Sequence, residues 1–306
     1  MNENFNTFEL LVLSGKGGTG KTSITASLAT LAKDAVLVDC DVDASNLELL
    51  LSPSLRKKEP YLGSMQARVN ADLCDNCGMC MELCRFGAIL SDGPANAKVE
   101  HTHRVSPTSC EGCAVCAQFC PHSAIDMVPV VGGEWYVSDT MQGPLVHARL
   151  QPGLGNSGKL TTLIRDKARM LARECGRTFM LLDGPPGIGC PVIASLTGTK
   201  QILVVTEPTP SGAHDLERVL ELAKHFKIPT WVCVNKFDLN MDATASIEAR
   251  ATELGATIVG RIPYDNSVTE AQKQGLPVIS MRASPAARAI QELWSKISPF
   301  LPEQSN

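Results

Sequence analysis

The stretch FELLVLSGKGGTGKT, residues 8–22, decides the fold of most of this chain. Its apolar half, Phe8–Ser14, has the length of a buried strand, and a helical stretch, Ser23–Lys33, follows the glycine-rich half. Strand, GxxxxGK[ST] and helix in this order are the context that a phosphate-binding P-loop requires. The glycines let backbone N–H groups converge on phosphate oxygens, and the helix N-terminus adds its dipole. The sequence therefore predicts a nucleotide site here.

Each residue type in this loop has an expected task. Lys21 should reach the β- and γ-phosphates, and Thr22 should place its hydroxyl on Mg2+. The residues expected to bind the nucleotide are Gly15, Lys16, Gly17, Gly18, Thr19, Gly20, Lys21, Thr22 and Ser23.

Apolar runs of strand length recur along the chain and alternate with helical stretches. The expected strands are Phe8–Ser14, Ala35–Asp39, Thr178–Asp183, Gln201–Thr206, Thr230–Asn235 and Thr257–Arg261. This alternation predicts an α/β fold with a doubly wound, mostly parallel sheet. In such a fold the nucleotide lies at the carboxyl ends of the strands.

Lys16 gives the loop the form Gly-Lys-Gly-Gly-x-Gly-Lys-Thr, which resembles the deviant Walker A motif of the MinD/ParA/nitrogenase-iron-protein group of P-loop ATPases. The resemblance implies an ATP-bound sandwich dimer, with a second copy or a paralogue, in which Lys16 contacts the nucleotide of the facing subunit. There the lysine would neutralise charge that grows in the transition state, as an arginine finger does. The alternative is a solvated loop lysine.

The same resemblance assigns tasks to two carboxylates. Asp41, after the strand Ala35–Asp39, matches the switch I position that orients the attacking water, and Asp39 would support the metal shell. Asp183 matches the Walker B carboxylate that holds Mg2+, with the switch II segment 184–187 behind it. Lys16, Lys21, Asp41 and Asp183 are thus the expected catalytic residues.

Base recognition is less sharply defined. Asn235-Lys236-Phe237-Asp238 has the N-K-x-D form by which GTPases read guanine, and Asn235 would serve the base edge in either case. Lys16 and the segment Glu207–Pro210 favour ATP on grounds of resemblance. Pro263 lies in a segment that resembles the family loop packed over the base.

Eight of the 12 cysteines form two runs of C-x2-C-x2-C-x3-C, the spacing by which bacterial-type ferredoxins hold two [4Fe–4S] clusters. Three closely spaced thiolates wrap one cluster, and the fourth, at a short helix that points away, reaches the other. One predicted ligand set is Cys74, Cys77, Cys80 and Cys120, and the other is Cys110, Cys113, Cys116 and Cys84. Zinc usually takes CxxC pairs that are well separated, and disulfides need an oxidising compartment. Both alternatives fit less well.

The two runs also repeat each other, because CDNCGMCMELCRFGAI aligns with CEGCAVCAQFCPHSAI. They interrupt the α/β pattern between switch I and Walker B. We therefore expect residues 64–130 to form an inserted small α+β ferredoxin-like domain, and residues 1–63 with 131–306 to form the P-loop domain.

Composition narrows the possible partners and location. A net charge of −4 over 306 residues gives no electrostatic case for nucleic acid. No apolar stretch approaches the roughly 18 residues that span a bilayer. The first residues do not have the features of a signal peptide, so a cytoplasmic protein without membrane insertion is expected.

Several other features have ordinary structural interpretations. Residues 135–137 and 145–150 predict a hairpin, and 155–159 a turn or a second anion-binding loop. The helix 286–298 should face the core rather than a membrane. His101–Arg104 is expected on an exposed hairpin, and Cys175 and Cys233 as buried thiols. Packing is the default for Cys190, with a metal bridge between two copies as the alternative.

As a whole, the sequence resembles a MinD-type ATPase with an inserted ferredoxin domain, with ATP, Mg2+ and two [4Fe–4S] clusters as cofactors. The leading hypothesis is nucleotide-gated electron transfer to a redox partner. The alternative is an ATP-dependent carrier or scaffold that delivers clusters or metal to an accepting protein. A GTPase or a spatial-positioning ATPase fits less well.

Overall fold

The computed structural model describes residues 7–151 and 157–302. The chain divides into two compact units. The first, the P-loop unit, comprises the described residues up to Lys58, Trp135–Ala148, and those from Ser157 onward. The second, the cysteine unit, comprises Glu59–Glu134 and residues 149–151. The inserted domain was expected at 64–130, a few residues inside the second unit at each end.

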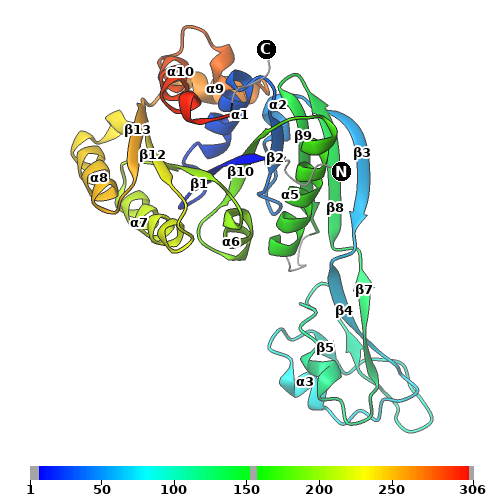
Figure 1. Ribbon diagram of the computed structural model, residues 1–306. Coiled ribbons are helices and arrows are strands. Elements are labelled where there is room, and N and C mark those ends of the chain that lie inside the picture. The colour runs from blue at the N-terminus through cyan, green and yellow to red at the C-terminus, as the bar shows by residue number, and fades with distance from the viewer. Residues whose placement is uncertain (1–6, 152–156, 303–306) are drawn as a thin grey trace. The chain divides into compact units, whose positions relative to one another are not determined.

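Within the described residues, nine strands form one sheet in the order β13-β12-β11-β1-β10-β2-β9-β8-β3 (Figure 1). The strands are β1 (Phe8–Ser14), β2 (Val36–Asp39), β3 (Ser54–Tyr61), β8 (Gly133–Thr140), β9 (Gly143–Leu150), β10 (Phe179–Pro186), β11 (Gln201–Thr206), β12 (Thr230–Asn235) and β13 (Thr257–Ile262). From β13 to β9 all neighbouring pairs are parallel. The predicted doubly wound, mostly parallel sheet is confirmed.

The helices that cover the sheet follow the strands in the chain. They are α1 (Lys21–Leu31), α2 (Glu48–Leu51), α5 (Ser157–Glu174), α6 (Cys190–Leu196), α7 (Pro210–His225), α8 (Met241–Glu253), α9 (Asn266–Lys273) and α10 (Pro285–Ile297). Short 3-10 turns occur at η1 (Phe237–Leu239), η2 (Val278–Ser280) and η3 (Ser298–Phe300). In Figure 1, α1 and α10 lie on one face of the central strands, and α6 and α7 on the other.

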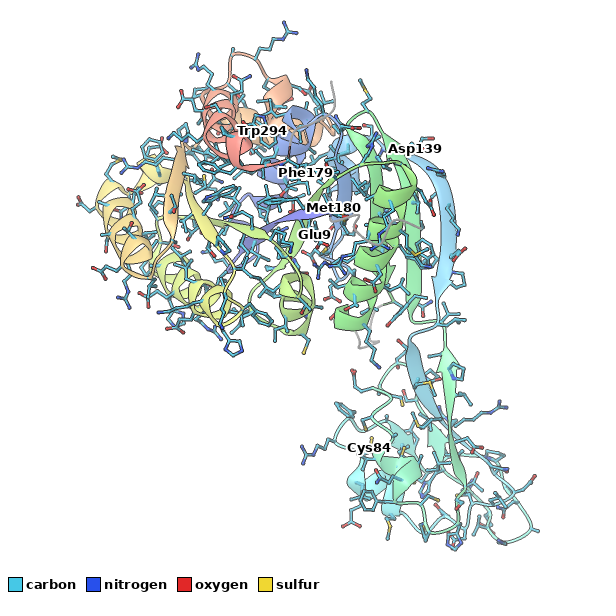
Figure 2. The ribbon with its side chains drawn as sticks, viewed as in Figure 1. Glu9, Cys84, Asp139, Phe179, Met180 and Trp294 are labelled. Atoms are coloured by element: carbon cyan, nitrogen blue, oxygen red, sulfur yellow. The ribbon has the colours of Figure 1, made fainter. Side chains whose placement is uncertain are left out.

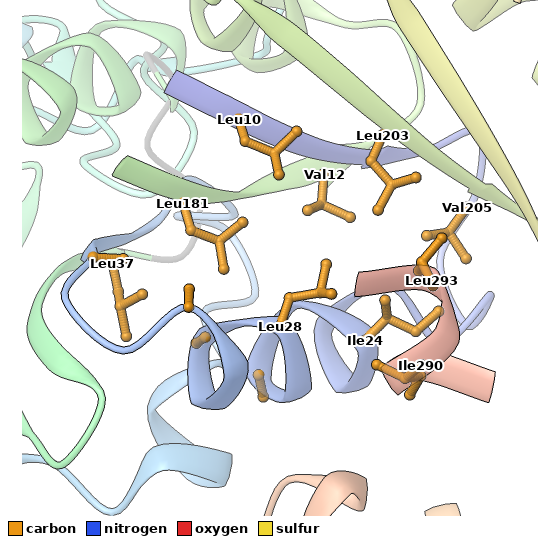
Figure 3. Packing of buried hydrophobic residues seen from close by; sticks show 14 of the residues in the cluster. Leu10, Val12, Ile24, Leu28, Leu37, Leu181, Leu203, Val205, Ile290 and Leu293 are labelled. Atoms are coloured by element: carbon orange, nitrogen blue, oxygen red, sulfur yellow. The ribbon is translucent and has the colours of Figure 1, made fainter. Parts of the chain in front are cut away.

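The core on the α1 face explains why these segments fold together. Ile24 and Leu28 of α1 and Ile290 and Leu293 of α10 pack against strand residues (Figure 3). The strand residues are Leu10, Val12, Leu37, Leu181, Leu203 and Val205. Because the apolar face of α10 is buried in this core, the C-terminal helix faces inward, as expected.

One edge of the sheet was only partly predicted. β8 and β9 are joined by two residues and lie side by side, which gives the expected hairpin. Beyond β8 lies the edge strand β3, which the sequence analysis did not predict because its residues are largely charged and exposed. Charged side chains are common on edge strands, where they discourage pairing with other chains.

Apart from the ends of β3, β8 and β9, the described part of the cysteine unit consists of two short sheets and two short helices. β4 (Ser64–Val69) pairs with β7 (Ile125–Val130), and β5 (Ile89–Leu90) pairs with β6 (Arg104–Val105), both antiparallel. The helices are α3 (Met79–Leu83), which Cys84 follows directly (Figure 2), and α4 (Val115–Gln118).

The internal repeat seen in the sequence also holds in the backbone. Three positions in each run have positive φ, and they pair as Asn76 with Gly112, Gly78 with Ala114, and Gly87 with Ser123. The amides of Asn70 and Ser106, equivalent in the two halves, donate to the carbonyls of Ala124 and Ala88 at 2.7 Å in both cases. The two halves of this unit therefore have the same local fold.

Two further expectations concern the segment before β10 and the possibility of a membrane span. The turn or anion loop expected at 155–159 falls partly outside the described residues, and Ser157 begins α5. In the part of the chain that the structure describes, no helix has the length and apolar character needed to cross a bilayer.

Candidate functional site

The P-loop site is built around the buried carboxylate of Asp183, at the carboxyl end of the central strand β10. Lys21 Nζ lies 2.7 Å from Asp183 Oδ1, and the Thr22 hydroxyl donates to Oδ2 at 2.7 Å. The Thr25 hydroxyl also donates to Oδ1, at 2.9 Å. The structure thus brings together the lysine, the hydroxyl and the carboxylate that the motif assigns to phosphate and Mg2+. Thr25, one turn further along α1, is an additional member that the motif did not include.

The loop between β1 and α1 has the backbone that its glycines permit. Gly20 adopts φ of 91° just before α1 begins at Lys21. A Cβ at Gly20 would lie 2.4 Å from Asn235 Nδ2, so this position requires glycine on both counts. Gly15, Gly17, Gly18 and Thr19 lie in this same loop, whereas Ser23 is on α1 and its hydroxyl accepts from the Gln272 side chain at 2.8 Å.

Asp39 lies beside Asp183 in register on the neighbouring strand β2. Its Oδ1 accepts from the Asp41 amide, and its Oδ2 accepts from the Ser45 hydroxyl and the amides of 46 and 47. Burial, and then the charge of Asp183, raise the pKa of Asp39 to about 7. Asp39 therefore holds the loop after β2, a role that the sequence analysis did not assign to it.

Asp41 stands on the loop that Asp39 holds. It is partly buried, and burial raises the pKa of its carboxyl. Its Oδ1 accepts from the Ala44 amide at 3.3 Å. The loop thus places a carboxylate near the P-loop lysine, whose charge acts on Asp41.

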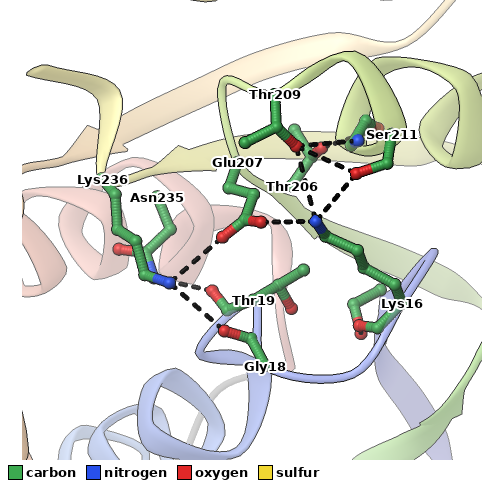
Figure 4. A network of polar contacts seen from close by, with 11 residues as sticks. Lys16, Gly18, Thr19, Thr206, Glu207, Thr209, Ser211, Asn235 and Lys236 are labelled. Atoms are coloured by element: carbon green, nitrogen blue, oxygen red, sulfur yellow. Dashed lines mark hydrogen bonds and ion pairs between the residues drawn. The ribbon is translucent and has the colours of Figure 1, made fainter. Parts of the chain in front are cut away.

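Lys16 does not extend into solvent; it contacts a second loop of its own chain (Figure 4). Its Nζ lies 2.6 Å from Glu207 Oε1 and donates to the Ser211 hydroxyl at 2.9 Å. Glu207 Oε2 in turn lies 3.1 Å from Lys236 Nζ, which also donates to the Gly18 carbonyl at 3.3 Å. One carboxylate therefore holds two lysines, and Lys236 adds a link to the P-loop itself.

Of the two segments expected to bind the nucleotide base, the one that begins at Asn235 contacts the P-loop. Asn235 Nδ2 donates to the Thr19 carbonyl at 2.7 Å. Asp238 Oδ1 accepts from the Tyr264 amide at 2.7 Å, so this carboxylate holds the loop that contains Pro263. In GTPases the equivalent aspartate reads guanine, whereas here one of its oxygens is engaged within the protein.

In the described part of the cysteine unit, two pockets are each lined by four of the predicted ligands. Cys74, Cys77, Cys80 and Cys120 line one pocket, which we call the first pocket. Cys84, Cys110, Cys113 and Cys116 line the other, the second pocket. The fourth cysteine of each run thus lies with the first three of the other run. These are the crossed sets that the spacing predicts, and their assignment to clusters remains a prediction.

The chemistry of the two pockets fits an iron–sulfur cluster. Burial, and then the neighbouring Cys74 thiol, raise the pKa of Cys80 to about 11, so the protein alone does not favour several thiolates here. Iron stabilises thiolates and would reverse that preference. The Ala88 amide donates to Cys84 Sγ and the Ala124 amide to Cys120 Sγ, both at 3.3 Å. Such N–H···S bonds favour a charged sulfur.

Some residues lie where the sequence analysis did not place them. His101 is exposed as expected, but His103 is 3% exposed, so the expectation of an exposed hairpin is wrong for His103. Cys175 was expected to be buried and is exposed, while Cys233 is buried as expected. Cys190 is exposed at the start of α6. The local sequence pattern did not reveal the ion pair of Glu207 with Lys16 or the burial of His103, because packing between distant segments decides both.

The fold and the P-loop geometry together define a P-loop nucleotide-binding protein. The family model of the CobQ/CobB/MinD/ParA nucleotide binding domain matches residues 10–278, so the chain belongs to this family. The resemblance inferred from Lys16 and the switch segments is thereby confirmed at the level of the family.

Individual relatives and solved structures are similar to this chain over most of its length. An uncharacterized protein of Methanocaldococcus jannaschii is 30% identical over 297 residues, which cover 96% of this chain and 97% of the relative. An iron-sulfur cluster carrier protein of Pyrococcus horikoshii is 24% identical over 314 residues, covering 97% and 87%. Among solved structures, the septum site-determining protein MinD of Pyrococcus horikoshii, complexed with Mg-ADP, has a TM-score of 0.60 at 17% identity, covering 96% and 97%. That structure supports the fold.

Proposed function

We propose that this chain is an ATP-hydrolysing iron–sulfur protein, in which the P-loop unit binds Mg–ATP and the cysteine unit binds two [4Fe–4S] clusters. The observation that carries the proposal is the pair of four-cysteine pockets, each drawn from both cysteine runs, in a chain of the MinD/ParA family. Eight cysteines arranged in this way match the chemistry of bacterial-type cluster binding. On this proposal residues 64–130 form the ferredoxin domain.

The residues around Asp183 account for nucleotide binding. When Mg–ATP binds, Lys21 leaves Asp183 and contacts the β- and γ-phosphates instead. Thr22 and Asp183 are then the residues that would hold the metal. The loop glycines and Ser23 line the phosphates, and Asn235 and Pro263 border the base. Mg2+ supplies charge neutralisation at the phosphates.

Hydrolysis requires two further residues. Asp41 orients the attacking water from the loop that Asp39 holds. Lys16 leaves Glu207 and reaches the nucleotide of the facing subunit, so that the active form is a dimer with a second copy or a paralogue. Lysine in that position stabilises the negative charge of the transition state.

The comparisons favour cluster delivery as the use to which the ATPase is put. Relatives named iron-sulfur cluster carrier proteins match at 22% to 24% identity over most of this chain. We therefore place the ATP-dependent carrier, with a cluster-accepting protein as partner, ahead of electron transfer.

Nucleotide-gated electron transfer to a redox partner is the second candidate, because one specific observation favours it. All eight cysteines of the two runs lie in the two pockets, four in each, so a four-iron cluster in either has a complete set of thiolates. A complete ligand set favours clusters that stay in place and pass electrons.

The two uses are separated by following iron. The full chain, reconstituted without oxygen with radiolabelled iron, is mixed with the apo-form of a [4Fe–4S] enzyme and ATP. A carrier transfers label faster with ATP than with a non-hydrolysable analogue, and the Lys21→Ala variant loses this stimulation. Label that stays on the chain while the midpoint potentials move with nucleotide supports electron transfer instead.

A further inference from the structure

The starting observation is a buried histidine without a hydrogen-bonding partner. His103 is 3% exposed. Among the residues that the structure describes, neither Nδ1 nor Nε2 of its ring has a hydrogen-bond partner. Buried polar groups nearly always have hydrogen-bond partners. Two ring nitrogens without a partner on one buried side chain therefore indicate that a ligand binds beside them.

His103 lines the first pocket, together with Cys74, Cys77, Cys80 and Cys120. The segment that precedes it is tied to the cysteine loop, since Asn96 Nδ2 donates to the carbonyls of Ala71 and Cys74 at 2.6 Å each.

Backbone contacts fix the position of the histidine within that segment. Thr102, next to His103, is fully buried, and its hydroxyl donates to the Pro94 carbonyl at 2.7 Å. The Gly93 amide donates to the Thr102 carbonyl at 2.8 Å. The backbone therefore holds the imidazole at the pocket.

The second pocket has no histidine among its described lining residues. Its other lining residues are mainly apolar, and include Ala67, Leu83, Phe86, Ala88 and Ile89. The repeat places Phe86 where the first pocket has His122, whose Nε2 lies 2.7 Å from Asp75 Oδ2. The two halves share a backbone fold but differ in the polarity around their cysteines.

We propose that His103 donates an N–H hydrogen bond to a sulfur of the cluster held by Cys74, Cys77, Cys80 and Cys120, and that this cluster is therefore the easier of the two to reduce. The inference rests on the proposed function, because it requires the clusters. Imidazole carries at least one N–H in either protonation state, so the donor is always present. A donor to a cluster sulfur stabilises the reduced, more negative cluster.

The test is a redox titration of the oxygen-free full chain, monitored by electron paramagnetic resonance. Wild type should show two one-electron steps. His103→Leu should make the cluster with the higher reduction potential harder to reduce. Its one-electron reduction equilibrium should change by about tenfold, which corresponds to a fall of ~59 mV in potential, and the potential of the other cluster should stay unchanged. His103→Gln, which keeps an N–H donor, should restore part of the shift. His101→Gln, at the exposed neighbouring histidine, should change neither step.

A second measurement detects the hydrogen bond itself. With 15N-labelled histidine, pulsed spectroscopy of the higher-potential cluster should show a weakly coupled nitrogen in the wild-type chain. Because His122 also lines this pocket, the coupling should persist in His122→Gln and be lost in His103→Leu. A strong coupling would identify His103 as an iron ligand. If there is no coupling and the potentials of the variants are unshifted, His103 does not contact the cluster. Either result overturns the inference. A chain that binds no iron overturns the proposed function as well, which separates the two failures.

Discussion

Lys16 Nζ and Glu207 Oε1 lie 2.6 Å apart within a single chain. Burial alone would raise the pKa of Glu207, but hydrogen bonds from Lys16 and Lys236 outweigh it and lower that pKa, so Glu207 is charged at neutral pH. The lysine that the family motif assigns to a facing subunit is thus bound by its own subunit. Formation of the proposed ATP dimer has to break this contact.

Removing the charge of Glu207 should therefore favour the dimer. An ion pair with a partly exposed lysine is worth up to about 1 kcal/mol, so Glu207→Gln should tighten ATP-dependent dimerisation by ~2–5-fold. Analytical ultracentrifugation with a non-hydrolysable ATP analogue measures the dissociation constant. Glu217→Gln, which removes a surface pair between Glu217 on α7 and Arg250 on α8, is the matched control and should leave the dissociation constant unchanged. An unchanged or weakened dimer in Glu207→Gln would show that the contact does not restrain Lys16.

Substitutions of Lys16 and Lys21 should affect different properties, namely turnover in the first case and nucleotide affinity in the second. Lys16→Ala should keep ATP affinity within about tenfold and lower kcat by roughly 100-fold or more, because the lysine acts on transition-state charge. Lys21→Ala should lose nucleotide binding itself. Fluorescent-nucleotide titration and a steady-state ATPase assay give the two quantities, and equal losses of affinity in both variants would contradict the assignment.

Asp265 predicts a pH dependence of stability. Burial acts to raise its pKa, but hydrogen bonds from the Ser284 hydroxyl and from the amides of Ser267 and Ala286 outweigh burial and lower the pKa to about 2. A depressed pKa stabilises the fold above the ordinary pKa of 3.8, and this stabilisation is lost as pH falls toward 2. The Asp265 carboxylate caps the N-terminus of α9 and accepts hydrogen bonds from Ser284 and Ala286 at the start of α10.

Asp265→Ala should accordingly lower the free energy of unfolding by about 1–2 kcal/mol at pH 7, the usual cost of losing a helix cap. The difference from wild type should shrink as pH falls from about 4 to 2. Urea denaturation across this range measures it. Asp242→Ala, at an exposed position in the first turn of α8, should cost under about 0.5 kcal/mol. A difference between Asp265→Ala and wild type that does not vary with pH would exclude the carboxylate as its source.

The crossed pockets make an unusual prediction for single cysteine variants. Cys120→Ala should remove the cluster of the first pocket, although Cys120 belongs to the second run, and should leave the Cys110, Cys113, Cys116 set intact. Cys84→Ala should do the reverse. Iron analysis should show about half of the wild-type content in each variant. If Cys120→Ala instead removes the same signal as Cys113→Ala and not the signal that Cys77→Ala removes, the assignment of the fourth cysteines is uncrossed.

The sequence predicted best the features that short segments determine. β1 has the predicted bounds Phe8–Ser14, and β2 and β11–β13 lie within one residue of the prediction, because apolar runs between polar breaks report burial directly. The P-loop geometry around Lys21 also follows from its motif, since the loop, its glycines and the helix start are contiguous. The crossed grouping of the cysteines was likewise predictable from their spacing.

Features set by distant parts of the chain were not predictable in the same way. Glu207 meets Lys16 only because β11 lies next to β1 in the sheet. His103 looked like part of an exposed His-x-His pair, but the bond from Asn96 to the cysteine loop and the burial of Thr102 draw it inside. The edge strand β3 has no apolar face, so no periodicity revealed it.

The most direct test of the central claim is an iron and acid-labile sulfide analysis of the full chain purified without oxygen. The account predicts about eight irons and eight sulfides per chain, with a brown colour that reduction bleaches. A colourless protein that binds zinc at these cysteines would contradict it, and would leave only the nucleotide-binding unit of the account standing.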